Sequence, residues 1–191
     1  MVPSIQAAPF SLTPTLSRWE REWKQGTRTD MVEPDIAVTV EEPAWLDALP
    51  DAEARLRVFA AAALGAGELG DGPVEVSVVL ASDAMVHEMN RQYRGQDKPT
   101  NVLSFATLDD EDAPLPEGAP LLLGDVVLAF ETVVREAGEQ GKPLADHFGH
   151  LVVHGVLHLL GFDHEDDGEA AEMEALEQAL LAALGVADPY S

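Results

Sequence analysis

Two apolar, β-prone runs constrain the fold of this chain more than any other feature. They are VEVSVVLA (residues 74–81) and LLLGDVVLAF (residues 121–130), and short apolar runs rich in branched side chains are typical of buried strands. The alternating IAVTVEE (36–42) and the apolar NVLSFATL (101–108) predict two further strands. A sheet built from such strands needs helices packed on it to bury its apolar side chains.

Helical patterns fill most of the chain between and after these strands. Residues 43–69 predict a helix in which Pro50 marks a break or a second start, and Ser82 and Gly95 mark the start and the end of a helix over 83–94. Three more helices are predicted over 131–142, 143–160 and 168–185. The order β-α-β-α-β-β-α-α-α mixes a hairpin with crossovers. It predicts an α+β (mixed α/β) domain with a small mixed sheet, about five helices and one histidine-bearing helix.

The first 30 residues differ from the rest. They hold scattered prolines, no apolar period and four of the eleven basic residues, Arg18, Arg21, Lys24 and Arg28. We interpret residues 1–30 as a disordered extension, with Met31 as a candidate natural start. A basic arm that contacts RNA is the alternative. Residues 31–191 then form a single domain, which is long enough to bury a core.

Composition limits the chemistry and the compartment. The chain has no cysteine, so any transition-metal site must use His, Asp and Glu. No apolar run approaches the roughly 20 residues of a membrane span, and the N-terminal residues lack the pattern of a secretory signal. We therefore expect a cytoplasmic protein that does not enter a membrane.

Three of the six histidines stand in HGVLHLLGFDH, residues 154–164. His154 and His158 are four residues apart and share one face of a helix, from which both rings can reach one ion. Gly161 allows the left-handed backbone that reverses the chain after a helix, so that His164 can return over the same face. The pattern predicts one Zn²⁺ ion held by His154, His158 and His164, with the open fourth position typical of catalytic zinc.

The same spacing occurs in the metzincin proteases, where a glutamate follows the first histidine and acts as general base. Here Gly155 takes that position, and a glycine cannot move a proton. A peptidase is therefore disfavoured. His147 and His150 lie on the same helical stripe. They could extend an active-site groove, but we interpret them as polar residues at its mouth.

A second group of candidate residues lies in NRQYRGQDKPTNVLSF, residues 90–105. Arg91, Arg94 and Lys98 could meet the charge of a phosphodiester, since a guanidinium binds phosphate oxygens in pairs. Helix capping or pairing with the many carboxylates explains them equally well. Asp125 could orient a ligand histidine, although a structural role at a strand is favoured. The net charge of −24 argues against non-specific binding to nucleic acid, so any RNA contact must use a local patch or a partner.

The segments HGVLHLLGFDH, YRGQDKPTNVLSF and LLGDVVLA together resemble the YbeY family of bacterial metallo-endoribonucleases, also described as rRNA maturation factors. The similarity covers most of residues 74–189. It implies that His154, His158 and His164 bind zinc and that Arg94 is the family's functionally important arginine. Ala106 departs from the family pattern, in which a proline is common at this position, and the acidic loop 109–120 would repel RNA.

The resemblance further implies cleavage of single-stranded RNA, work on the 3′ end of small-subunit (16S) rRNA, and ribosome quality control with the ribosome or small-subunit proteins as partners. DNA is not expected as a substrate. Arg94, His154 and His158 are then the catalytic candidates. The proton acceptor stays open between water at the metal, Asp163 and the RNA's 2′-hydroxyl. Two alternative functions remain, a ribosome-assembly factor with a structural zinc and a zinc hydrolase of another substrate. Activity that depends on docking to a ribosomal partner is also open.

Overall fold

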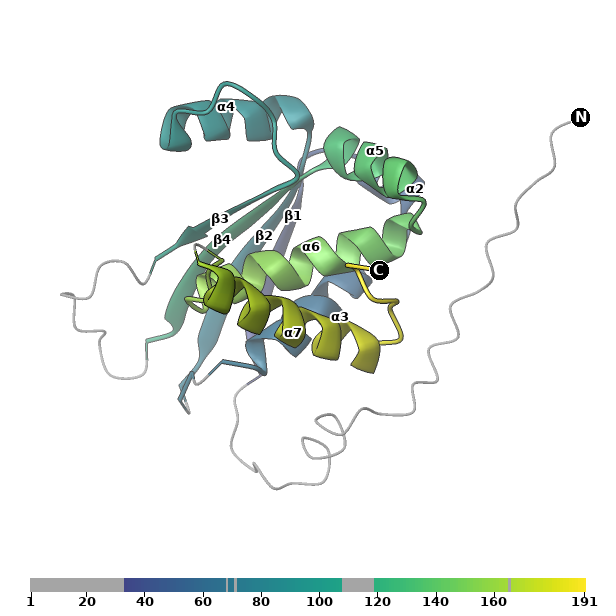
Figure 1. Cartoon of the computed structure of the whole chain (residues 1–191). Helices are drawn as coiled ribbons and strands as arrows, with labels where there is room; N and C mark the ends of the chain where they lie inside the picture. The colour runs from purple at the N-terminus through teal and green to yellow at the C-terminus, as the bar shows by residue number, and fades with distance from the viewer. Residues whose placement is uncertain (1–32, 68, 71, 108–118, 165) are drawn as a thin grey trace, which may run out of the picture. The chain divides into compact units, whose positions relative to one another are not determined.

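A four-stranded mixed sheet lies at the centre of the fold (Figure 1). The computed structural model describes residues 33–67, 69–70, 72–107, 119–164 and 166–191. The predictions for residues 1–30 and for nearly all of the acidic loop fall outside these residues. The strands are β1 (Asp35–Val40), β2 (Val74–Ala81), β3 (Val102–Ala106) and β4 (Leu121–Ala129), arranged in the order β1-β2-β4-β3.

The strand directions follow from the connections between the strands. β1, β2 and β4 run parallel, whereas β3 pairs antiparallel with β4, the strand that follows it in the chain. Crossovers through helices join the parallel strands, as parallel pairing requires. The predicted α+β class and the predicted order of elements are confirmed.

The helices are α2 (Ala44–Ala48), α3 (Ala52–Leu64), α4 (Asp83–Arg94), α5 (Phe130–Gln140), α6 (Leu144–Leu159) and α7 (Asp167–Ala183). The structure therefore has six helices in its described part rather than about five, because Pro50 divides the first helical segment. Leu49, before this proline, takes the non-helical angles φ −138° and ψ 81°, in keeping with the clash that disfavours helical angles before proline. None of the described helices has the length and apolarity needed to cross a membrane.

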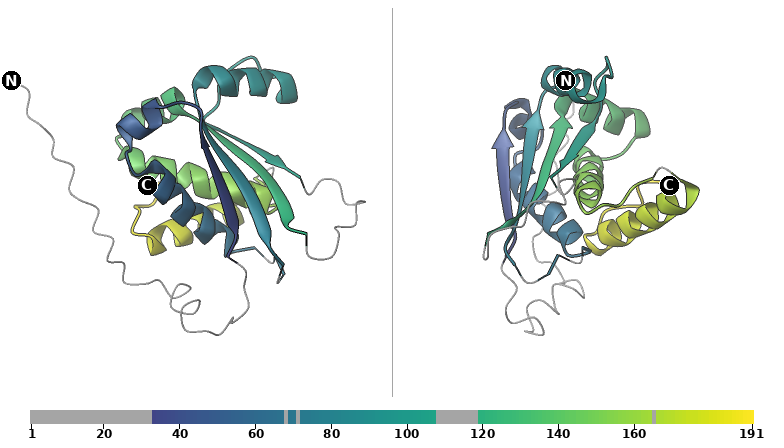
Figure 2. Two further views of the ribbon diagram at one scale, coloured as in Figure 1. Left: turned by 180° about the vertical axis from the view of Figure 1, so that it is seen from behind. Right: turned by 90° about the vertical axis from the view of Figure 1, so that its left-hand side faces the viewer.

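The two faces of the sheet carry different helices. Side chains of β2 and β4, including Val76, Val78 and Val126, pack with α3 and α6 in the main core. Val86 of α4 packs with Leu103 and Val127 in a smaller core on the other face. Figure 2 shows α6 and α7 layered on one side of the strands, with α4 at one end of the sheet.

Helix α6 approaches the sheet closely at Gly155. The Ser104 hydroxyl on β3 donates a 2.9 Å hydrogen bond to the Gly155 carbonyl, and Gly155 itself is buried. A side chain at this position would occupy the space of Val126 on β4. The contact fixes the second half of α6 against β3 and β4, and with it the histidines at positions 154 and 158.

Candidate metal centre and cation pocket

The chain reverses at the end of α6 in the way that the sequence predicts. Gly161 adopts a φ of +87°, its N–H donates to the His158 carbonyl at 3.1 Å, and the Phe162 N–H donates to the Leu157 carbonyl at 3.1 Å. These two bonds form the Schellman motif, which uses a left-handed residue to close a helix. The turn brings the segment that carries His164 back toward α6.

Two hydrogen bonds fix the imidazoles of His154 and His158. The His154 Nδ1 atom lies 2.8 Å from Glu177 Oε1, and the His158 Nδ1 atom lies 3.0 Å from the Phe162 carbonyl oxygen. A carbonyl or an ionised carboxylate can only accept, so each Nδ1 atom must carry the proton. In the neutral rings both Nε2 atoms then hold a free lone pair.

The two Nε2 atoms lie 3.1 Å apart. Two lone pairs at this distance repel each other unless a cation lies between or beside them. A proton is disfavoured there, because burial and the neighbouring His154 and His164 lower the pKa of His158. Ligand nitrogens about 2.0–2.1 Å from a tetrahedral Zn²⁺ are separated by roughly 3.3–3.4 Å. The arrangement therefore fits a metal ion.

His164 completes the group. Its exposed ring lies 5.7 Å from the ring of His154 and 5.0 Å from that of His158, measured between centroids. One ligand atom from each of the three histidines can be chosen so that all lie within 4.8 Å of one another. The structure brings together the three residues that the sequence selects, with the third on the solvent side.

Glu177 of α7 is a component of this centre that the sequence analysis missed. Its side chain is 0% exposed, yet it contacts His154, His150 and the Tyr190 hydroxyl. Burial alone would raise the pKa of Glu177, but the hydrogen bonds from these three groups lower it to about 2. Asp125, which was considered for this orienting role, is exposed on β4. The next residue, Val126, points to the face of the sheet that α6 covers, so Asp125 points to the opposite face.

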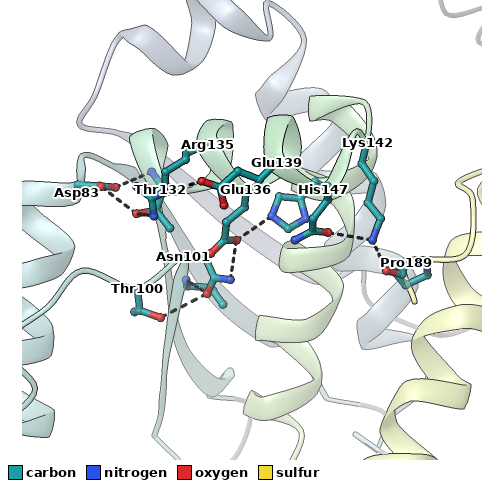
Figure 3. Close-up of polar contacts among 12 residues, drawn as sticks. Asp83, Thr100, Asn101, Thr132, Arg135, Glu136, Glu139, Lys142, His147 and Pro189 are labelled. Atoms are coloured by element: carbon teal, nitrogen blue, oxygen red, sulfur yellow. Dashed lines mark hydrogen bonds and ion pairs between the residues drawn. The ribbon is translucent and has the colours of Figure 1, made fainter. Parts of the chain in front are cut away.

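His147, His150 and His154 lie along one stripe of α6. The ring centroids are 6.4 Å apart between His147 and His150, and 6.1 Å apart between His150 and His154. His147 is buried, and its Nε2 atom lies 3.0 Å from Glu136 Oε2 on α5. The same carboxylate accepts from Asn101, which precedes β3 (Figure 3). His147 thus joins α5, α6 and the start of β3. His147 and His150 also line a pocket between the start of α6 and the segment after α7.

The second predicted group forms a pocket at the end of α4. The pocket has a volume of about 490 Å³ and is lined by Asn90, Arg94, Gln96, Lys98 and Thr100. Buried Asn90 shapes it, because its amide donates to the Lys98 carbonyl at 2.7 Å and its own carbonyl accepts from the Gln96 N–H at 3.2 Å. These bonds fold the loop after α4 back along the helix toward β3 (Figure 1).

The pocket holds unpaired positive charge. Among the lysines and arginines in the described part of the chain, only Arg94 and Lys98 have side chains without a hydrogen bond or ion pair to another residue. Arg91, one turn from Arg94, forms a 2.8 Å ion pair with Glu88. In a chain with a net charge of −24, two free cations in one pocket suit an anionic ligand.

The histidines and the cation pocket are separate in the structure. Helix α6 packs on one face of the sheet and α4 on the other. In Figure 1 the ends of both helices point to the same side, with β3 between them. A single flexible polyanion could contact both regions by passing the β3 edge of the sheet.

Comparisons with known proteins found similar proteins over most of this chain. A family model described as "Endoribonuclease YbeY" matches residues 51–185. A protein named Endoribonuclease YbeY from Paramagnetospirillum magneticum is 70% identical over 156 residues, which cover 82% of this chain and 95% of that protein. A protein of the same name from Rhodospirillum rubrum is 56% identical over 163 residues, which cover 82% and 81%. The solution structure of TM1509 from Thermotoga maritima matches with a TM-score of 0.50 and 27% identity over 78% of this chain and 88% of that one.

Proposed function

This chain belongs to the endoribonuclease YbeY family, and we propose that it is a zinc-dependent endoribonuclease that cleaves single-stranded RNA during maturation of the 3′ end of 16S rRNA. Its partners would be the ribosome or small-subunit proteins in the cytoplasm. Residues 31–191 would carry the activity, with residues 1–30 as an extension of that domain.

The facing Nε2 atoms of His154 and His158 are the observation that carries the metal part of this proposal. Both rings use Nδ1 to donate, so both lone pairs point to one place. His164 supplies a third nitrogen from the solvent side. Neutral imidazoles suit zinc, and three protein ligands leave one position for solvent or substrate. A Zn²⁺ ion held there supplies a Lewis acid that polarises a phosphodiester and lowers the pKa of a water.

Arg94 and Lys98 support the RNA part. A guanidinium binds the oxygens of a phosphate in pairs, and because the pocket lies apart from the histidines it would hold a phosphate of the strand other than the one that is cleaved. We assign this role to Arg94 because its side chain has no competing carboxylate in the described structure, whereas Arg91 is paired with Glu88. The two free cations in one pocket would give so acidic a chain a local site for RNA in place of a broad basic face.

The proton acceptor is not a residue at position 155. Gly155 is buried and faces Val126 and Ser104 of the sheet, so a peptidase-type glutamate could not project from there to the metal. Asp163 accepts the backbone N–H of His164 at 2.7 Å and is exposed. The 2′-hydroxyl of the RNA is the candidate nucleophile, and the proton that it gives up would have to pass to Asp163 or to a water at the metal. If this hydroxyl attacks the phosphate, DNA is not cleaved.

The test is cleavage of three matched oligonucleotides by zinc-loaded protein: single-stranded RNA, the same RNA in a duplex, and the DNA of the same sequence. We expect cleavage of the single-stranded RNA alone. Equal cleavage of the DNA would remove the 2′-hydroxyl mechanism. The zinc-loaded protein is assayed alone and with small ribosomal subunits that contain precursor 16S rRNA. If it cleaves no RNA under either condition, the proposed function is contradicted.

A further inference from the structure

Glu177 is a fully buried carboxylate in a helix that otherwise carries its acidic residues on the surface. It lies between Met173 and Leu181, one turn away on either side, and both are buried. An isolated buried carboxylate is costly, and one that persists is paired and hydrogen-bonded. Glu177 meets this requirement with three donors, so its position needs an explanation in terms of what those donors do.

The first donor links Glu177 to the metal centre. His154 Nδ1 lies 2.8 Å from Glu177 Oε1, and His154 Nε2 faces His158. The carboxylate therefore fixes which nitrogen of His154 carries the proton, and it fixes the rotation of the ring. Carboxylates that accept from a ligand histidine in this way orient the ring and increase its basicity toward a metal.

The other two donors hold the carboxylate itself. Glu177 Oε2 accepts from the Tyr190 hydroxyl and lies 3.3 Å from His150 Nε2. Tyr190 belongs to the segment after α7. This segment is fastened by the contact between Lys142 and the Pro189 carbonyl (Figure 3) and by the packing of Val186 on the core. The ring of His150 lies 5.5 Å from that of Tyr190.

We propose that Glu177 is a positioning residue of the metal centre and that Tyr190 orients it, so that residues 186–191 help to set the metal affinity of His154, His158 and His164. This inference rests on the metal site of the proposed function. Glu177 does not touch substrate. It acts on the metal only through His154, and Tyr190 acts only through Glu177.

A competing explanation is that His150, His154 and Glu177 bind a second ion, since one ligand atom from each can lie within 4.8 Å of the others. The distances favour hydrogen bonds, because the 2.8 Å contact has the length of a charge-assisted N–H···O bond. A second ion would also take the Nδ1 proton of His154. The proposal therefore requires one ion per chain.

The test measures zinc affinity by competition with a chromophoric chelator at neutral pH. The variants are Glu177→Gln and Tyr190→Phe, and the matched control is Glu172→Gln, which removes the same charge from an exposed position of the same helix. We expect Glu177→Gln to weaken zinc binding by about 10- to 100-fold. Tyr190→Phe should weaken it by a smaller factor, and Glu172→Gln should leave it within twofold.

A second readout follows the ring itself. Nitrogen NMR of the histidine side chains in the zinc form should show His154 bound through Nε2 and protonated at Nδ1. In Glu177→Gln the Nδ1–H signal of His154 should exchange faster with solvent. Wild-type affinity in both Glu177→Gln and Tyr190→Phe would overturn the proposal, as would two zinc ions per chain with one lost in His150→Gln. If Glu177→Gln does not fold, Tyr190→Phe decides, because Tyr190 is 45% exposed and its substitution disturbs the core little.

Different results would refute the metal site and the role of Glu177. A wild-type protein that binds no zinc would refute the metal site of the proposed function itself. A wild-type protein that binds one zinc ion and cleaves RNA, together with a Glu177→Gln protein of unchanged zinc affinity, would refute only the role of Glu177.

Discussion

Gly155 of α6 faces Val126 of β4 so closely that a Cβ atom on the glycine would lie 2.6 Å from Cγ1 of the valine. The same atom would lie 3.3 Å from the Ser104 hydroxyl oxygen. The residue after the first zinc-candidate histidine therefore points into the sheet. This separates the site from zinc peptidases with the same histidine spacing more firmly than the missing carboxylate does.

Gly155→Ala should destabilise the protein by about 1–3 kcal/mol, because the added methyl group must push α6 from the sheet or force Val126 to move. The control is Gly138→Ala in α5, where nothing lies within 4 Å of an added Cβ. That change should stabilise the helix by up to about 1 kcal/mol. Urea unfolding of the metal-free proteins measures both. Equal stabilities for the two variants would show that the close contact is absent.

Gly161→Ala should cost about 1–2 kcal/mol, the penalty of a left-handed residue with a Cβ atom. It should also weaken zinc binding, because the turn at Gly161 places the Phe162 carbonyl on His158 Nδ1. Gly141→Ala is the matched control, since Gly141 ends α5 with a φ of +66°. It should lose similar stability and keep its zinc affinity. Chelator competition would contradict the account if both variants bound zinc like wild type.

The metal-free protein should lose stability as the pH falls from about 7.5 to 5.5. Burial lowers the pKa of His147, although Glu136 opposes the shift, and burial acts on His158 in the same direction. In the unfolded chain these two histidines take up protons below their ordinary pKa of about 6.5, whereas in the folded chain they do so only at lower pH. Stability is therefore full above this value and falls below it, by at most about 1.4 kcal/mol per pH unit for each group.

The contribution of His147 to this loss of folding stability can be measured separately. His147→Gln cannot titrate, so its unfolding free energy should fall less between pH 7.5 and 5.5 than that of wild type, whatever its stability at pH 7.5. Urea unfolding at the two pH values, with chelator present, provides the comparison. A fall as large as that of wild type would mean that His147 is not held neutral in the fold.

Arg94→Ala should weaken binding of single-stranded RNA and reduce its salt dependence. Each lost phosphate contact lowers the slope of log K against log salt by about 0.7 for a single strand. Arg91→Ala is the control on the same helix, because Arg91 is already paired with Glu88. Fluorescence anisotropy with a non-cleavable RNA at several salt concentrations measures both slopes. Identical slopes for the two variants would show that the pocket does not contact phosphate.

Local signals made most of the fold predictable. Helix α4 begins after Ser82 and ends before Gly95, as the sequence predicts. An N-cap residue and a left-handed glycine both act within one turn of the helix, so their effect can be read from the local sequence. The three histidines were predictable for the same reason, since His154 and His158 share one helix face and Gly161 reverses the chain directly after it. Their spacing carries nearly all the geometry that the site needs.

Contacts between distant segments were not predictable. Glu177 lies 23 residues from His154, and only its place between Met173 and Leu181 in the apolar stripe of α7 marked it as a buried carboxylate. The sequence could not exclude Asp125 as the carboxylate that orients a ligand histidine. The face of β4 on which Asp125 lies depends on the register of β4 with β2 and β3, which the sequence does not reveal. The separation between Arg94 and the histidines likewise depends on which face of the sheet each helix covers.

The central claim is that His154, His158 and His164 hold the one metal ion that RNA cleavage needs. Metal content by plasma mass spectrometry tests it most directly, on purified wild type, His158→Ala and the exposed-histidine control His87→Ala, with cleavage of single-stranded RNA assayed on the same samples. The account predicts about one zinc ion per chain in wild type and His87→Ala, and the loss of both zinc and cleavage in His158→Ala. Cleavage by His158→Ala at the wild-type rate, or a wild-type protein without metal that still cleaves RNA, would contradict it.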